Sequence, residues 1–308
     1  MKKIYYLIFV LLILACNPSR EKKEFVFFYE FENEDSISSG EVSETIFVLN
    51  KRLNQFSNQH EITEFERNKL KVKITDYELD TLRLNKIILN KGKLEFWELY
   101  HVEEIFHEIL KIGSFYEDKA KDSLKNKPFL DMFTALGHQY GPIIAFCKAE
   151  DTVAINKMLN DKDTRFQMKP EYINTKFLWG IADENNNLPL YAAKSNRNNI
   201  PPLTGESILK AKQVTDVVDR PAVLIEMNKE GAITWERLTE NAFKNASYIA
   251  VTLNDLVYSA PGVTVGPIQG GLTQIAGDFT LSQAQDLAII LSSQKSIPQL
   301  RPIQDVTQ

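Results

Sequence analysis

Hydrophobic residues behind the N-terminal segment repeat with two different periods. Aromatic, β-branched or alternating apolar residues predict strands over residues 25–31, 70–75 and 93–100. Apolar residues three and four positions apart, with charges between them, predict helices over residues 41–56 and 78–89. This strand–helix–strand–helix–strand order favours a small α+β sandwich with its helices on one face of a sheet.

Residues 101–199 have a weaker pattern, with short apolar stretches separated by charged ones. The stretches predict helices over residues 103–111, 129–136 and 152–160. They also predict a strand-like run over 142–147 and a hairpin over 177–194. Cys147 lies in the strand-like run without a neighbouring His or Arg, which indicates a buried, inert thiol. A reactive thiol is the alternative.

The last hundred residues carry clearer turn and cap signals. Asn254-Asp255 between two apolar runs predicts a hairpin, and Gln274-Ile275-Ala276 after two glycines predicts a short edge strand. Thr280-Leu281-Ser282-Gln283 matches a capping box and predicts a helix to about residue 293. A strand over 223–227 and a helix over 231–245 complete this pattern, and Pro298 and Pro302 are expected to end regular structure.

Composition excludes several classes of protein. The chain has 308 residues, of which 44% are hydrophobic and 25% charged, as in a packed globular protein. A formal net charge of −5 argues against non-specific nucleic-acid binding, which needs a basic surface. Two cysteines and four histidines leave little material for a disulfide framework or a metal cluster, so we expect neither metal nor cofactor.

The N-terminus resembles a bacterial lipoprotein signal. Lys2 and Lys3 precede an unbroken apolar run over residues 4–15. Twelve helical residues span about 18 Å, which is short of the ~30 Å hydrocarbon core, so the run suits a cleaved signal peptide. Leu12-Ile13-Leu14-Ala15-Cys16 then looks like a lipobox, in which the Cys16 thiol takes the lipid. An ordinary secretory signal that contains a cysteine is the alternative.

This interpretation places the protein in the cell envelope. Acyl chains such as palmitate on Cys16 would hold it on a membrane, facing the periplasm or the cell exterior. Residues 17–24 are polar, contain a proline and suit a short tether. No other apolar stretch approaches 18 residues, so the body of the chain is expected outside the cytoplasm and outside the bilayer.

Residues 203–298 resemble the distal part of the first periplasmic domain of SecD, an accessory subunit of the Sec protein-export channel. The order and spacing of short motifs carry the resemblance, and the motifs are Leu203-Thr204-Gly205, Pro221-Ala222-Val223, Ile249-Ala250-Val251-Thr252-Leu253, Ser259-Ala260-Pro261, Ile268-Gln269-Gly270-Gly271, Ile275-Ala276-Gly277-Asp278-Phe279-Thr280 and Ile297-Pro298. Residues 25–100, which end in Leu94-Glu95-Phe96, resemble the ferredoxin-like base of that family more weakly.

The resemblance implies an α+β fold with two lobes behind a cleaved lipoprotein signal peptide. We expect five segments: signal peptide 1–15, lipidated tether 16–24, ferredoxin-like base lobe 25–110, intermediate α/β segment 111–199 and SecD head-like domain 200–303. The chain departs from the family where a lipid anchor replaces the membrane helices, and where Asn254-Asp255-Leu256 replaces the usual Asp-Gly turn. Without intramembrane ionisable residues the chain has no proton path, so its action is expected to be passive binding.

The expected function is therefore non-enzymatic: a membrane-anchored SecD-like lipoprotein that binds polypeptides outside the cytoplasm and assists protein export. Unfolded exported proteins or Sec translocon components are the expected partners. We place partner binding on the loops between the last strands, at Asn254, Asp255, Tyr258, Gln269, Gly270 and Gly271. An envelope lipoprotein that uses the SecD-like fold to bind an unrelated partner or a glycan is the alternative, because fold does not fix function.

The sequence contains no complete motif of the catalytic classes considered, zincins and serine hydrolases. His107-Glu108-Ile109-Leu110-Lys111 has a lysine where a zincin helix needs its second histidine, and no Gly-x-Ser-x-Gly elbow is present. Gly270 and Gly271 are interpreted as positions that a turn or bulge requires. We therefore predict no catalytic residue.

Overall fold

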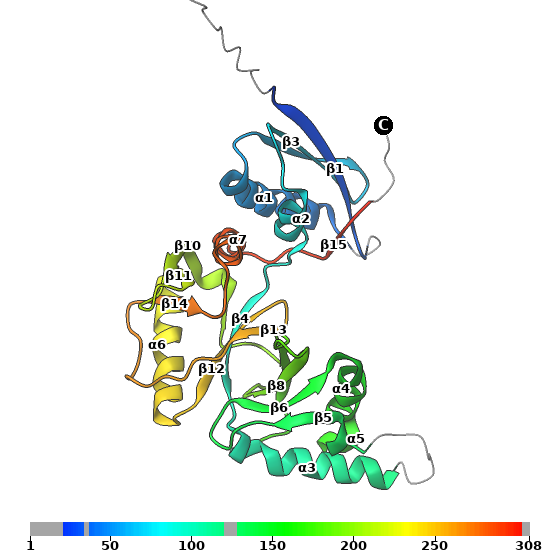
Figure 1. Cartoon of the computed structure of the whole chain (residues 1–308), viewed down its shortest axis with the longest axis vertical. Helices are drawn as coiled ribbons and strands as arrows, with labels where there is room; N and C mark the ends of the chain where they lie inside the picture. Colours follow the sequence, from blue (N-terminus) through cyan, green and yellow to red (C-terminus); the bar gives the residue numbers. More distant parts are fainter. Residues whose placement is uncertain (1–20, 34–36, 120–127, 304–308) are drawn as a thin grey trace, which may run out of the picture.

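The computed structural model is a mixed α+β fold that describes residues 21–33, 37–119 and 128–303 (Figure 1). Within these ranges the strands form sheets of four, three and eight strands. The predicted fold class is therefore confirmed. The predicted signal peptide, Cys16 and most of the charged stretch after residue 119 lie outside the described residues.

The four-stranded antiparallel sheet and two helices form a ferredoxin-like lobe. Its strand order is β15-β1-β3-β2, and its chain order is β-α-β-β-α-β. Alternate residues of the strands pack against both helices, which buries Tyr29, Leu49 and Val72 completely or nearly so. The elements are β1 (Lys23–Phe31), α1 (Ser39–Phe56), β2 (His60–Glu66), β3 (Lys69–Asp76), α2 (Thr81–Leu89) and β15 (Leu300–Pro302).

The last strand of this lobe differs from the expectation. We predicted that residues 93–100 supply it, but β4 (Leu94–Leu99) pairs in the eight-stranded sheet. The fourth strand is β15, which pairs with β1 from Tyr29↔Pro302 to Phe31↔Leu300 and follows a proline expected to end regular structure. The reason is that an edge strand needs few pairs, so three residues far along the chain complete a sheet that local sequence leaves open.

Five strands of the eight-stranded sheet close into a ring. The sheet order is β5-β6-β8-β7-β13-β12-β4-β9, and a further pairing of Leu99 with Ala193 joins β4 to β8. Each ring strand contributes to one buried cluster, with Trp97 from β4 and Leu178 from β7 among its members. The strands not yet given are β5 (Phe133–Leu136), β6 (Ile143–Lys148), β7 (Lys176–Gly180), β8 (Asn187–Ala193), β9 (Leu203–Thr204), β12 (Tyr248–Leu253) and β13 (Leu256–Ser259).

Three helices cover the end of this sheet that β5 and β6 form. They are α3 (Val102–Lys119), α4 (Thr152–Asn160) and α5 (Lys162–Arg165). The helix predicted over residues 129–136 is wrong: Leu130–Met132 form one 3₁₀ turn, and β5 pairs with β6. Sheet pairing outweighs the weak local helix signal of so short a segment. Cys147 on β6 is buried, as predicted.

The three-stranded sheet and two helices enclose the core of the C-terminal part. The sheet order is β10 (Ile208–Thr215), β11 (Pro221–Met227), β14 (Leu272–Ala276), with α6 (Lys229–Lys244) and α7 (Leu281–Ser292) beside it. The predicted capping box at Thr280 is present. The predicted hairpin is also present, since β12 and β13 pair antiparallel. Asn254 and Asp255 form its turn, with φ of 54° and 65°.

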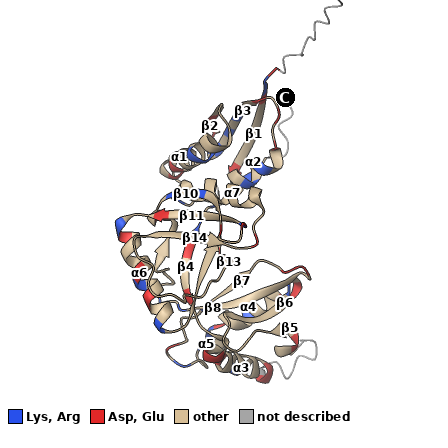
Figure 2. Ribbon diagram, turned by 60° about the vertical axis from the view of Figure 1, so that its left-hand side comes forward, with Lys and Arg blue, Asp and Glu red and all other residues tan. Residues whose placement is uncertain are grey.

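Strand β4 is buried on both faces and separates two cores. Phe96 packs into the core of the C-terminal part, whereas Trp97 packs into the ring. Its two acidic residues, Glu95 and Glu98, which are red on the ribbon in Figure 2, are also buried, and each pairs with a lysine. Burial alone would raise the pKa of Glu98, but Lys194, 2.8 Å away, and hydrogen bonds from Asn245 and Ser247 outweigh burial and hold that pKa below its ordinary value.

A buried arginine joins the ferredoxin-like lobe to both segments that connect it with the rest. Arg52 on α1 is completely buried and donates hydrogen bonds to the carbonyl oxygens of Ile87, Asn90 and Lys91 and to the Ser293 hydroxyl. Burial lowers its pKa to about 10, so the side chain remains a cation at neutral pH. The carbonyls at the end of α2 suit this charge, because a helix C-terminus is the negative end of its dipole.

We predict that Arg52→Met lowers the free energy of unfolding by about 2–4 kcal/mol, because it leaves several buried carbonyl groups without a hydrogen-bond donor. Urea unfolding followed by circular dichroism measures the change. Arg237→Met on the exposed side of α6 is the control, with an expected change within about 0.5 kcal/mol. Equal stability of the two variants would contradict this role of Arg52.

Candidate functional site

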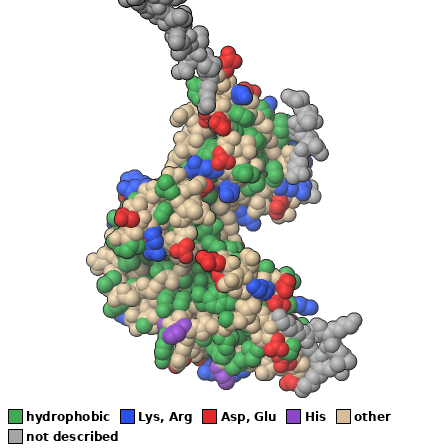
Figure 3. Space-filling view, viewed as in Figure 1, with side chains coloured by type: hydrophobic (Ala, Val, Ile, Leu, Met, Phe, Trp, Pro, Cys, Tyr) green, Lys and Arg blue, Asp and Glu red, His purple; other side chains and the backbone are tan. Residues whose placement is uncertain are grey.

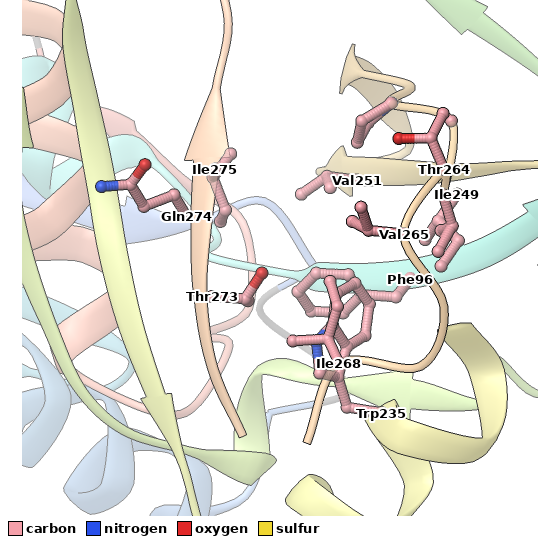
Figure 4. Close-up of a pocket in the computed structure, with 13 residues that line it drawn as sticks. Phe96, Trp235, Ile249, Val251, Thr264, Val265, Ile268, Thr273, Gln274 and Ile275 are labelled. Atoms are coloured by element: carbon pink, nitrogen blue, oxygen red, sulfur yellow. The ribbon is translucent and has the colours of Figure 1, made fainter. Parts of the chain in front are cut away.

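A cavity of about 170 Å³ opens between β14 and the segment that follows β13. Figure 4 shows Thr273 and Ile275 of β14 on one side of it and Val251 and Val265 on the other. The lining is mostly apolar and comprises Phe96, Trp235, Ile249, Val251, Pro261, Gly262, Val263, Thr264, Val265, Ile268, Thr273, Gln274 and Ile275. Few convergent polar groups in an apolar hollow are typical of a binding site.

The end of the cavity is formed by two aromatic rings from different elements. Phe96 of β4 and Trp235 of α6 meet edge to face, with ring centroids 5.4 Å apart. Both side chains are at least 96% buried, so their positions are fixed by the core rather than by the surface loops. The cavity is thus an opening into the hydrophobic core and has a rigid floor.

The loop over residues 260–271 forms the outer wall. Its start is held by a hydrogen bond from the Ile249 amide to the Pro261 carbonyl, at 3.0 Å. Its far part is held by the Ile268 amide, which donates to the Thr239 hydroxyl at 2.9 Å. Between these points Val265 is 94% exposed, so the loop presents an apolar side chain to solvent beside the cavity.

Strand β14 borders the cavity with an unpaired backbone edge. It ends the three-stranded sheet, and no other strand among the described residues pairs with it besides β11. The Met227 amide donates to the Gly271 carbonyl, so alternation in an antiparallel ladder directs the backbone groups of Leu272, Gln274 and Ala276 outward. The predicted edge strand is confirmed, and its outer edge is available for pairing.

Two of the predicted binding residues make the turn before β14. Gly270 and Gly271 have φ of 78° and 67°, and a Cβ on Gly271 would lie 2.6 Å from that of Ala232. Glycine is therefore required at Gly271 by both backbone conformation and space, as the sequence suggested. Gln269 next to them is exposed and donates to the Glu236 carboxylate of α6 at 2.8 Å.

The predicted residues at the β12–β13 turn are engaged within the chain. Asn254 accepts a hydrogen bond from the Lys93 amide, and Asp255 lies 2.9 Å from the Lys93 amine and 3.1 Å from that of Lys176. Both amines also pair with buried Glu95. Burial alone would raise the pKa of Asp255, but the two lysines outweigh it and lower that pKa.

The structure therefore divides the six predicted residues into two groups. Tyr258 is half-buried, packs against the core of the C-terminal part, and lies 6.4 Å from Phe279 between ring centroids. It lies on β13, which follows the Asn254-Asp255 turn, whereas residues 269–271 lie in the turn before β14, and none of the six residues lines the cavity. No hydrogen bond or ion pair within the described ranges joins the two groups.

The cavity residues Trp235, Val265 and Ile268 were missed as site residues by sequence reasoning. Trp235 has helical spacing with Leu238 and Ala242, which predicts burial and nothing about a cavity. Val265 lies between two glycines in a loop, and such an apolar residue in a turn-rich segment is the one signal that could have indicated an exposed wall.

The described residues contain neither a candidate metal site nor a candidate membrane-spanning helix. There, no group of three or more His, Cys, Asp or Glu side chains is placed to hold a metal ion. The ring nitrogens of His101 lie 3.1 Å and 3.3 Å from the Tyr140 and Asn245 carbonyl oxygens, and a protonated ring nitrogen donates to its carbonyl, which is a structural contact. Among the helices of the described part, none combines the length and the apolar character that crossing a bilayer requires.

Comparison with known proteins confirms the resemblance drawn from the sequence. Residues 187–295 match the family model of the SecDF P1 head subdomain. Protein translocase subunit SecD of Rhodothermus marinus is 25% identical over 240 residues, which is 70% of this chain and 38% of that protein. SecD of Calditerrivibrio nitroreducens is 42% identical over 91 residues, 29% of this chain and 17% of that protein. The chain thus spans less than two fifths of the length of these relatives.

Solved structures show the same fold. A SecDF in a super-membrane-facing form matches with a TM-score of 0.56 and 18% identity, over 94% of this chain and 32% of that one. A structure titled as a membrane component SecDF that enhances protein export matches with a TM-score of 0.51 and 18% identity, over 92% of this chain and all of that one. At this identity the matches establish fold alone.

We predict that Asp255→Asn makes the protein less stable at pH 7, because Lys93 and Lys176 lose a charged partner. The lowered pKa of Asp255 means that its contribution is present above the ordinary pKa of about 3.9 and is lost as pH falls further. Urea midpoints of both proteins, measured between pH 2 and 7, should differ at neutral pH and converge at the acid end. A constant difference at all pH values would contradict the assignment.

Proposed function

From the similarity of residues 187–295 to the SecDF P1 head subdomain, we propose that this protein is a SecD-like component of protein translocation that binds extended polypeptides outside the cytoplasm. One observation supports it most: the open edge of β14 lies beside an apolar cavity. The edge supplies hydrogen bonds that any sequence can make, and the cavity supplies hydrophobic contact. Together they suit unfolded chains of varied sequence.

A polypeptide would bind by adding a strand next to β14. Gln274 would exchange backbone hydrogen bonds with the guest, since its amide and carbonyl face outward. Guest side chains alternate in direction, so every second one faces the cavity side. Affinity then comes from the backbone and selectivity from the cavity, which is the division of labour in β-augmentation.

Such binding assists translocation without an energy source. A segment held on the far side of a membrane cannot slide back, so capture biases diffusion in one direction. Apolar side chains gather on the visible face of Figure 3, over the region where Figure 1 labels β4 and β12. Such an exposed apolar surface would provide further contact for an unfolded chain.

A lipid on Cys16 would hold this binding surface close to a membrane. Strand β1 begins at Lys23, so six residues separate it from Cys16. Fully extended, six residues span at most about 20 Å. The ferredoxin-like lobe would then stand on the membrane surface, with the β14 edge beyond it.

We predict that Gln274→Pro weakens binding of an unfolded preprotein by at least about tenfold, because proline removes the outward amide and obstructs strand addition. Fluorescence anisotropy with a labelled preprotein measures the affinity. Gln274→Ala is the matched control and should bind normally, since it keeps the backbone amide. If neither the wild type nor the control binds unfolded preproteins, the proposed function is wrong.

In cells, photo-crosslinking from residue 265 should capture Sec components and nascent exports. Capture of one unrelated envelope protein, or of none, would instead favour the alternative of an envelope lipoprotein with its own partner.

Replacement of the predicted lipidation site, Cys16→Ser, is expected to release the protein from the membrane fraction, because no acyl chain can be attached. Fractionation followed by immunoblotting measures this, with Cys147→Ser as a control that should stay on the membrane. Continued sedimentation of the Cys16 variant with membranes after carbonate extraction would rule out the lipid anchor.

A further inference from the structure

The three tryptophans of the chain differ in how their indole N–H groups are satisfied. Trp97 donates to the Glu95 carboxylate at 2.9 Å, and Trp179 donates to the Asn156 side-chain oxygen at 3.0 Å. Trp235 is 96% buried, yet its Nε1 has no hydrogen-bond partner among the residues that the structure describes. A buried donor without an acceptor is unfavourable and is rare in folded proteins.

This donor belongs to the wall of the cavity beside β14. Trp235 lines the cavity together with Phe96 and Ile268 (Figure 4). The other lining side chains that carry polar groups are Thr264, Thr273 and Gln274, and Figure 4 shows the Gln274 amide directed away from the cavity. The unsatisfied N–H thus belongs to one of the few lining residues of an apolar hollow that carry a polar group, and an acceptor on a ligand would satisfy it.

We propose that the cavity receives one large apolar side chain of a guest polypeptide, and that Trp235 Nε1–H donates to a backbone carbonyl of the guest beside it. This inference rests on the proposed function and adds to it a chemical selectivity. The guest must offer an apolar group and a carbonyl acceptor together, and an extended peptide does so at each of its apolar residues.

The size of the cavity agrees with this occupant. Its volume of about 170 Å³ is close to that of the ~150 Å³ engineered apolar cavity that holds one benzene molecule. A Phe or Leu side chain is of this size, whereas a charged side chain would leave its charge without a partner among the apolar walls. The site should therefore prefer Phe and Leu over Ala and disfavour Lys.

A lipid acyl chain fits the observations less well. It would fill the apolar space but would leave both the indole N–H and the outward backbone groups of Leu272 and Gln274 without partners. A polypeptide satisfies the backbone groups and the indole with the same strand. The combination of donor, edge and cavity therefore favours a peptide.

The test follows the three indole N–H signals by ¹H–¹⁵N NMR on the whole protein, with its tryptophans labelled with ¹⁵N at Nε1. Signals are assigned with Trp179→Phe and Trp235→Phe. Addition of an extended peptide with a central Phe should shift the Trp235 signal downfield, as a new hydrogen bond requires, and leave the Trp97 signal in place. Binding of the peptide without a shift at Trp235 would overturn the inference and leave the proposed function intact.

Affinities provide the second readout. Trp235→Phe keeps an aromatic ring but removes the donor, so peptide affinity should fall about three- to tenfold, while Trp179→Phe leaves it unchanged. A central Ala in the peptide should weaken binding to the wild type, and a central Lys should weaken it further. If decanoate gives the same downfield shift and displaces the peptide, the site is an acyl-chain site and the inference is wrong. If no peptide binds the wild type, the proposed function itself fails.

Discussion

The buried guanidinium of Arg52 is the contact that joins the ferredoxin-like lobe to the rest of the protein. The ferredoxin-like lobe is interrupted after α2 and is completed by β15, so the chain leaves the lobe at residues 90–93 and returns at 293–299. Arg52 binds carbonyl groups of the departing segment and the hydroxyl of Ser293 on the returning one. A cation can stay in this buried position because carbonyl dipoles surround it, and each of those carbonyls in turn needs its donor.

The departing segment continues directly into β4, which carries the next constraint. Both faces of β4 are buried, so its residues must satisfy two different cores at once. Glu95 and Glu98 on the same strand are held by lysines that come from β7 and from beyond β8. Backbone pairing with β12, β8 and β9 sets the register of β4, and Phe96 of this strand lines the cavity.

The binding features lie where the regular packing ends. β14 keeps a free edge because it is the last strand of an open three-stranded sheet, and loop residues between 261 and 268 line the cavity beside it. The same geometry leaves the Trp235 indole without an acceptor. An open edge, an apolar hollow and an unsatisfied donor occur together in one region, and this combination is the basis on which we propose an extended polypeptide as its occupant.

Local sequence determined most of the secondary structure, since the hydrophobic periods, the capping box at Thr280 and the Asn254-Asp255 turn depend on neighbouring residues. It also determined the head resemblance and the edge strand at 274–276. Tertiary structure alone decided that β15 completes the first sheet, that residues 133–136 form a strand, and that Asp255 pairs with Lys93 and Lys176. It alone left Trp235 unpaired in a cavity. Each of these depends on contacts between residues far apart in the chain, which no local period encodes.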